Sequence, residues 1–204
     1  MGNNAGKTVK SAVGKAQTVV EGGIHGLSAC MSKDTGDISD IKKETPVTIG
    51  FHGPDIHFDD LRVSGSGVAL ASESISQDKA YFEVKIAKAE GRWGVGVCKQ
   101  SVHSSDELNV EGEGWCLSSV QLEYGEGDVI GVTYDQSIFP TALRFYHNGE
   151  VLEELTITSI RGEVFPAVHV TDGAVVDCEF DGENGFAYPP PAGFTGVVSM
   201  RSVM

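Results

Sequence analysis

The sequence predicts an all-β protein, an antiparallel β-sandwich behind a flexible or weakly helical N-terminal arm. Three observations support this fold class. Short alternating apolar runs recur at intervals of roughly a dozen residues, as they do in sandwiches. The 204 residues include 26 glycines, which indicate many turns. Beyond the arm no segment has the apolar period of a helix, which argues against the alternating strands and helices of a parallel sheet.

The chain changes character near residue 45. Residues 1–45 contain no Phe, Trp or Tyr, and their valines and alanines between Val9 and Val20 recur at roughly helical spacing. This pattern is weakly amphipathic and stops at two consecutive glycines. We therefore expect a basic and polar arm with a linker over residues 1–45, a sandwich over residues 46–196 and a C-terminal tail over residues 197–204.

The first clear strand is predicted over residues 81–86. Phe82, Val84 and Ile86 fall on one face of this segment, while Glu83 and Lys85 fall on the other. That alternation is typical of a strand with one face in the core and the other toward solvent.

A second strand is predicted over residues 93–97. Trp93, Val95 and Val97 share one face, and the two glycines between them leave the other face bare. A strand with one bare face usually lets another layer approach closely. We expect Trp93 to pack in the core.

The strongest turn signal is Asn148-Gly149, between the alternating segments 143–147 and 150–152. Both residues tolerate the positive φ of a type I′ turn, so the segment predicts a β-hairpin. Further strands are predicted within the segments 127–134, 164–170 and 174–180.

Composition limits the classes of partner. Hydrophobic residues make up 40% of the chain and charged residues 22%, as in ordinary globular proteins. The net charge is −14; residues 1–29 hold three lysines and one glutamate, so the remainder carries −16. A phosphate backbone would repel a domain with so much negative charge, and we expect no nucleic-acid partner.

The four cysteines suggest a reducing compartment. Cys30, Cys98, Cys116 and Cys178 show no C-x-x-C spacing, and the sequence has no pattern of a secretory signal peptide. No apolar run approaches the ~18 residues of a membrane span. We expect a cytoplasmic protein whose cysteines behave as small buried hydrophobes.

No arrangement of residues predicts catalysis, a cofactor or a metal. Cys98, His103 and Asp106 lie close in sequence, but neighbouring positions rarely build a triad, and we interpret them as a strand end and a loop. His52 and His57 have the spacing of two zinc ligands but no cysteine pair, and we interpret them as surface-loop residues. We expect a protein that is not an enzyme and has no cofactor.

Five motifs in order resemble the SPRY domain family. They are YFEV at 81–84, WGVGV at 93–97, GDVIG at 127–131, NG at 148–149 and FPAV at 165–168. The resemblance covers residues 46–196 and implies a bent sandwich of two antiparallel sheets. It also implies a non-catalytic adaptor whose loops at one end of the sandwich bind a short peptide from a partner protein. The positions of this chain that match those loops are Ser64, Gly65, Lys99, His103, Trp115, His169, Thr171 and Asp172.

Three of these positions need comment. Thr171 and Asp172 stand where peptide-binding members often present an aromatic residue. Trp115 follows an acidic, glycine-rich stretch at 111–114 and is either a core residue or a ligand contact. If it anchors a peptide, the surrounding carboxylates favour a basic partner.

The N-terminus resembles a myristoylation start. Gly2 becomes terminal once Met1 is removed, although Gly6 stands where Ser or Thr is usual. Lys7, Lys10 and Lys15 would supply the second, electrostatic contact that stable peripheral membrane anchoring requires. The alternative is a tail whose glycine is incidental.

Two functions follow as hypotheses. The first is a peptide-binding adaptor, tethered to a membrane if Gly2 is acylated. The second is a structural subunit of a larger assembly, held through the arm and one sheet face.

Overall fold

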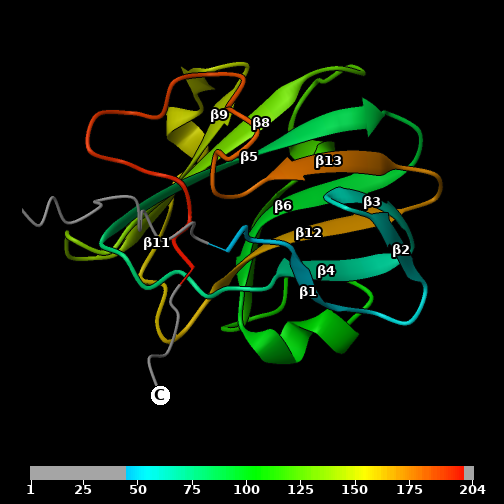
Figure 1. The fold of residues 1–204 in the computed structure, drawn as a ribbon, viewed down its shortest axis with the longest axis horizontal. Coiled ribbons are helices and arrows are strands. Elements are labelled where there is room, and N and C mark those ends of the chain that lie inside the picture. The colour runs from blue at the N-terminus through cyan, green and yellow to red at the C-terminus, as the bar shows by residue number, and fades with distance from the viewer. Residues whose placement is uncertain (1–44, 200–204) are drawn as a thin grey trace, which may run out of the picture. The chain divides into compact units, whose positions relative to one another are not determined.

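Thirteen strands build two antiparallel sheets in the computed structural model, which describes residues 45–199 (Figure 1). The described residues belong to one compact unit, Lys42–Met204. The antiparallel sandwich predicted from the sequence is confirmed. The helical pattern predicted in the arm lies outside the described residues, and so does Gly2.

The first sheet has five strands, in the order β1 (Ile49–His52), β4 (Gly67–Ala71), β12 (Phe165–Thr171), β6 (Arg92–Cys98) and β7 (Gly114–Ser118). The second has eight: β10 (Glu150–Val151), β9 (Ala142–His147), β8 (Val129–Asp135), β5 (Lys79–Lys88), β13 (Val175–Glu179), β3 (Arg62–Gly65) and β2 (Ile56–Asp59), with β11 (Ile157–Thr158) beside β9. Three short 3₁₀ helices lie in the connections: η1 (Gln100–Ser104), η2 (Ser119–Gln121) and η3 (Glu153–Leu155).

The main core lies between the two sheets, where the alternation in sequence placed it. Phe82, Val84 and Ile86 are fully buried from β5, and Trp93 and Val95 from β6. Burying each such side chain contributes about 1.5–3 kcal/mol. The prediction that Trp93 is a core residue is confirmed.

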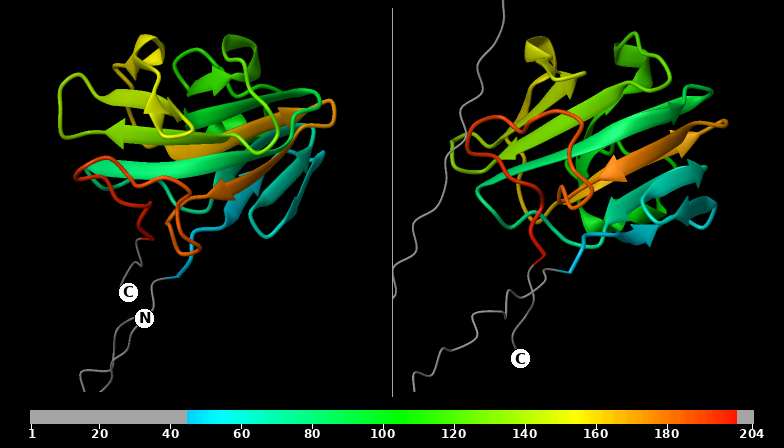
Figure 2. Two further views of the ribbon diagram at one scale, coloured as in Figure 1. Left: turned by 90° about the horizontal axis from the view of Figure 1, so that it is seen from above. Right: turned by 45° about the horizontal axis from the view of Figure 1, so that its top comes forward.

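The outer face of the eight-stranded sheet is covered by the segment that follows β13 (Figures 1 and 2). The Glu83 carboxylate on β5 is only 3% exposed. It accepts hydrogen bonds from the Tyr81 hydroxyl at 2.7 Å and from the backbone N–H groups of Ala187 and Tyr188 at 2.6 and 2.9 Å. The Phe186 ring packs edge-on against Tyr81, with 4.9 Å between ring centroids. Glu83 thus fastens the C-terminal segment to the sheet.

The predicted hairpin turn has the expected backbone. Asn148 and Gly149 have φ values of 51° and 84°, both in the left-handed region, as a type I′ turn requires. The turn joins β9 to β10, and Glu150 pairs with His147 across it.

One part of the histidine interpretation is wrong. His52 and His57 were expected in a surface loop, but they lie on β1 and β2, both exposed. The sequence did not predict these two four-residue strands, because a short exposed strand lacks the long alternating pattern by which strands are recognised.

The Asp128 carboxylate ties two turns of the second sheet together. It accepts hydrogen bonds from the His147 ring at 2.8 Å, from the Asn148 side chain at 3.0 Å and from the Gly125 N–H at 2.9 Å. Hydrogen bonds from Asn148, His147 and Gly125 lower the pKa of Asp128 from 3.8 to about 2.

This pKa predicts an acid-sensitive contribution to stability. Because the folded pKa lies below the unfolded one, the contribution is complete above pH 4 and is lost as the pH falls through about 2. Asp128→Asn should therefore be less stable than wild type by about 1 kcal/mol at pH 6, solvent screening included. Urea titrations at pH 6 and pH 2 measure the difference, which should be much smaller at the lower pH. A difference of the same size at both pH values would contradict the assignment.

Candidate functional site: a pocket on the five-stranded sheet

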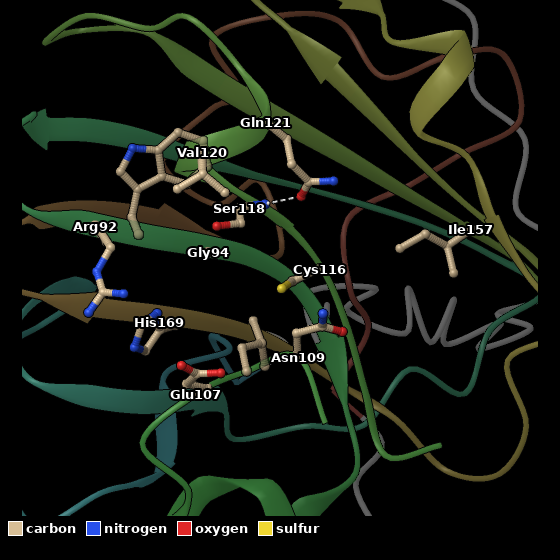
Figure 3. Close-up of a pocket in the computed structure, with 12 residues that line it drawn as sticks. Arg92, Gly94, Glu107, Asn109, Cys116, Ser118, Val120, Gln121, Ile157 and His169 are labelled. Carbon is tan, nitrogen blue, oxygen red and sulfur yellow. Dashed lines mark hydrogen bonds between the residues drawn. The ribbon is translucent and has the colours of Figure 1, made fainter. Parts of the chain in front are cut away.

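The outer face of the five-stranded sheet is covered over only part of its area. The connection between β6 and β7 packs Val102 and Leu108 against Val68, Leu70 and Ala167 of the sheet, forming a second, smaller apolar cluster. Beyond this cluster lies an open pocket of about 450 Å³ (Figure 3). We call it the outer pocket.

Five segments from different parts of the chain contribute to the outer pocket. Its lining residues come from β6, the β6–β7 connection, β7 with η2, β11 and β12: Arg92, Trp93, Gly94, Glu107, Leu108, Asn109, Cys116, Ser118, Val120, Gln121, Ile157 and His169. A pocket of this size with convergent polar groups is the usual form of a binding site.

Gly94 forms part of the floor of the pocket. A Cβ atom at this position would lie 3.6 Å from the Cys116 sulfur and 3.6 Å from the Cβ of His169. The absence of a side chain therefore leaves open the space between β7 and β12. The bare face predicted for this strand is confirmed at Gly94, although what lies above it is the pocket and not another layer.

Charged groups are unevenly placed in the outer pocket. In Figure 3, Arg92, His169 and Glu107 lie toward one end, Ile157 toward the other, and Cys116 between them. The Arg92 guanidinium is paired with the Asp172 carboxylate at 3.5 Å.

The two side chains nearest the floor are neutral near pH 7. Burial lowers the pKa of His169, and the opposing effect of a hydrogen bond that the ring donates to the Asp106 backbone carbonyl is smaller. Burial also raises the pKa of Cys116 to about 12. Cys116 is thus a protonated thiol and a poor nucleophile, since the thiolate is the reactive form.

The other arrangements examined in the sequence do not form reactive sites. Cys98 is buried in the smaller apolar cluster, and burial raises its pKa to about 12. The His103 ring, close to it in sequence, contacts the Gln100 carbonyl at 2.6 Å. Among residues 45–199, no cluster of three or more His, Cys, Asp or Glu side chains is placed to hold a metal ion. In the same range no helix is long and apolar enough to cross a membrane.

The structure does not bring the eight predicted site residues together. His169 lines the outer pocket, and Asp172 touches it only through Arg92. Thr171 shares a hydrogen bond of 3.3 Å with Ser66 at the edge of the sandwich. Ser64 and Gly65, which precede Ser66, lie on β3 of the other sheet.

The remaining predicted residues lie elsewhere. Lys99 follows β6 at the end opposite Arg92, and its N–H donates to the Glu113 carbonyl at 2.7 Å. His103 lies in η1 and packs near the ring of Phe51. Trp115 is partly buried and packs against the main core, which favours the first of the two roles considered for it, a core residue, over a ligand contact.

Sequence reasoning missed most residues of the outer pocket. Glu107, Asn109, Gln121 and Ile157 come from two connections and the short strand β11, and they carry no local motif. The signal that was present is Gly94, whose bare face marks the floor.

Comparisons with known proteins agree with this architecture. The family model of the SPRY domain matches residues 79–183. The chain therefore belongs to the SPRY domain family, which is a family of protein-interaction modules. This supports a non-catalytic binding role.

Individual relatives cover most of the sandwich. SPRY domain-containing protein 7 from Homo sapiens is 33% identical over 165 residues, covering 70% of this chain and 76% of the relative. The Gallus gallus protein of the same name is 32% identical over 158 residues, with the same coverage. The crystal structure of the SPRY domain of human HERC1 matches with a TM-score of 0.44 and 20% identity, over 61% of this chain and 86% of that one.

Proposed function

We propose that the protein is an adaptor that binds a peptide segment of a partner protein in the outer pocket. The observation that carries the proposal is the pocket itself: about 450 Å³, with a glycine floor and polar groups from four segments around it. Its protonated Cys116 thiol is a poor nucleophile, which supports binding over nucleophilic chemistry.

The charge of the pocket favours a basic partner. Arg92 is already paired with Asp172, whereas Glu107 makes no ion pair among residues 45–199 and is exposed at the pocket edge. The chain as a whole carries −14. An incoming Lys or Arg side chain would therefore be attracted over a long range and paired at the site.

A structural role in a larger assembly is the second candidate. The loop between β8 and β9 carries Phe139, which is 96% exposed, beside Ile138 at 43%. An exposed aromatic tip is a frequent anchor at protein contacts. In this role the neighbouring subunit would cover Phe139 and Ile138, and no peptide would bind in the outer pocket.

Localisation belongs to the proposal as well. We expect a cytoplasmic protein with peripheral membrane contact if Gly2 is acylated, because Lys7, Lys10 and Lys15 would add the electrostatic contact that one acyl chain needs. Gly2 and the three lysines lie outside the described range, and both statements stay predictions.

The test uses peptides selected on the full chain from a displayed library of random nonapeptides. Glu107→Lys should weaken the selected peptides about tenfold or more, because it replaces the attracting charge with a repelling one. Gly94→Val should weaken them similarly by filling the floor. Titration calorimetry measures both changes.

Glu150→Lys is the matched control. It makes the same change of charge at an exposed position of β10, at the edge of the other sheet, and should leave affinity within about threefold. Equal losses with Glu107→Lys and Glu150→Lys would show a general charge effect and no pocket. Selected peptides that need Phe139 instead would favour the assembly role.

A further inference from the structure

Strand β7 is the last strand of the five-stranded sheet, with β6 on one side and no strand of residues 45–199 on the other. The pairing shows which of its backbone groups face outward. The Lys99 N–H donates to the Glu113 carbonyl at 2.7 Å, one pair beyond the paired residues Cys98 and Gly114. Hydrogen-bonded pairs alternate with non-bonded pairs in an antiparallel ladder. The N–H and C=O groups of the alternate β7 positions therefore point away from β6; these positions are Gly114, Cys116 and Ser118.

Two of these three outward N–H groups are satisfied locally. The Gly114 N–H donates to the Val110 carbonyl at 2.8 Å, and the Ser118 N–H donates to the Gln121 side chain at 2.9 Å (Figure 3). Neither the N–H nor the C=O of Cys116 has a hydrogen-bond partner among residues 45–199. Along the free edge of β7, the N–H groups of Gly114 and Ser118 are therefore already hydrogen-bonded, and the backbone groups of Cys116 are available to a partner.

Cys116 lines two clefts. One is the outer pocket, and the other is a smaller cleft of about 190 Å³, whose lining includes the apolar residues Leu117, Phe145, Leu155 and Ile157 beside the polar Gln121, Glu154 and Thr156. Cys116, Gln121 and Ile157 line both.

This arrangement fits the geometry of an added strand. Successive residues of a strand point to opposite faces of the sheet. A residue that pairs with Cys116 would exchange two backbone hydrogen bonds with it and point its side chain into the outer pocket. Its two neighbours would point to the opposite face, toward Leu117 and the smaller cleft.

The charges around Cys116 favour a basic residue at the peptide position that pairs with it. Glu107 lies in the outer pocket, and Glu154 lines the rim of the smaller cleft. Arg92 is paired with Asp172, so it does not offset them. A Lys or Arg at the centre would complement Glu107, while apolar neighbours would fill the second cleft.

We infer that the partner binds by strand addition: an extended segment with a basic residue between two apolar residues pairs with Cys116 at the free edge of β7. This inference rests on the proposed function and adds the backbone pairing and the residue pattern. The occupant is a peptide segment of a partner protein.

The experiment uses the nonapeptides selected on the full chain, resynthesised with single N-methyl groups. Methylation at the basic residue removes the donor to the Cys116 carbonyl and should weaken binding about tenfold or more. Methylation at either neighbour, whose N–H points away from β7, is the matched control and should cost less than about threefold. The sequences themselves should show the apolar–basic–apolar pattern and no proline at its centre.

The outcomes distinguish a failure of strand addition from a failure of binding in the outer pocket. Peptides that lose affinity with Glu107→Lys but tolerate every N-methyl group would overturn strand addition and leave pocket binding standing. A library that yields no binder would overturn both. A chain that sediments as a dimer, with the Cys116 amide protected from hydrogen exchange in the absence of peptide, would assign the edge to a second copy and overturn the peptide proposal.

Discussion

Glu83→Ala should lower the free energy of unfolding by about 3–5 kcal/mol, one of the two largest effects that the structure predicts. The Glu83 carboxylate is buried and receives three hydrogen bonds, two of them from backbone N–H groups of the C-terminal segment. Its removal leaves the Ala187 and Tyr188 N–H groups and the Tyr81 hydroxyl without an acceptor. Urea unfolding at pH 7, followed by tryptophan fluorescence, measures the loss.

Two further variants make the result specific. Tyr81→Phe removes one of the three hydrogen bonds and should cost about 1–2 kcal/mol. Glu150→Ala removes an exposed carboxylate and should stay within about 0.5 kcal/mol of wild type. A Glu83→Ala protein as stable as Glu150→Ala would show that the C-terminal segment is held in another way.

Gly96→Ala should destabilise the sandwich by about 2–4 kcal/mol, because the added methyl group would overlap the backbone of the neighbouring strand β7. A Cβ atom at Gly96 would overlap the Trp115 carbonyl oxygen and lie 2.7 Å from the Cys116 Cα atom, both on β7. Relief requires β7 to shift away from β6. Thermal unfolding measures the change.

Gly94→Ala is the matched comparison, two residues earlier on the same face of β6. Its added Cβ would have ordinary contacts of 3.6 Å and should cost less than about 1 kcal/mol. Equal losses at the two glycines would contradict the close approach of β7 at Gly96. The comparison also distinguishes the roles of the two glycines: Gly96 allows the close approach of β7, and Gly94 forms part of the floor of the outer pocket.

The fold was predictable because its determinants are local. The alternation of Phe82, Val84 and Ile86 places one face of β5 in the core, and Asn148-Gly149 supplies the positive φ values of the hairpin turn. The exposed strands β1 and β2 were missed, since four residues with one buried side chain carry almost no period.

The candidate site was less predictable because it is not local. Glu107, Gln121 and Ile157 become neighbours only when β6, β7, β11 and β12 are placed, and nothing in their own segments distinguishes them. Resemblance selected loops at one end of the sandwich, of which only His169 reaches the outer pocket. The open edge at Cys116 depends on the register of β7 against β6, which the sequence does not specify.

Hydrogen exchange of the full chain, with and without a selected peptide, tests the central claim most directly. Binding in the outer pocket predicts slower exchange at residues 106–121, the Cys116 amide included, with Ser64 and Gly65 unchanged. Slower exchange confined to residues 64–67 and 171–173, or to the loop around Phe139, would place the partner elsewhere and contradict the account.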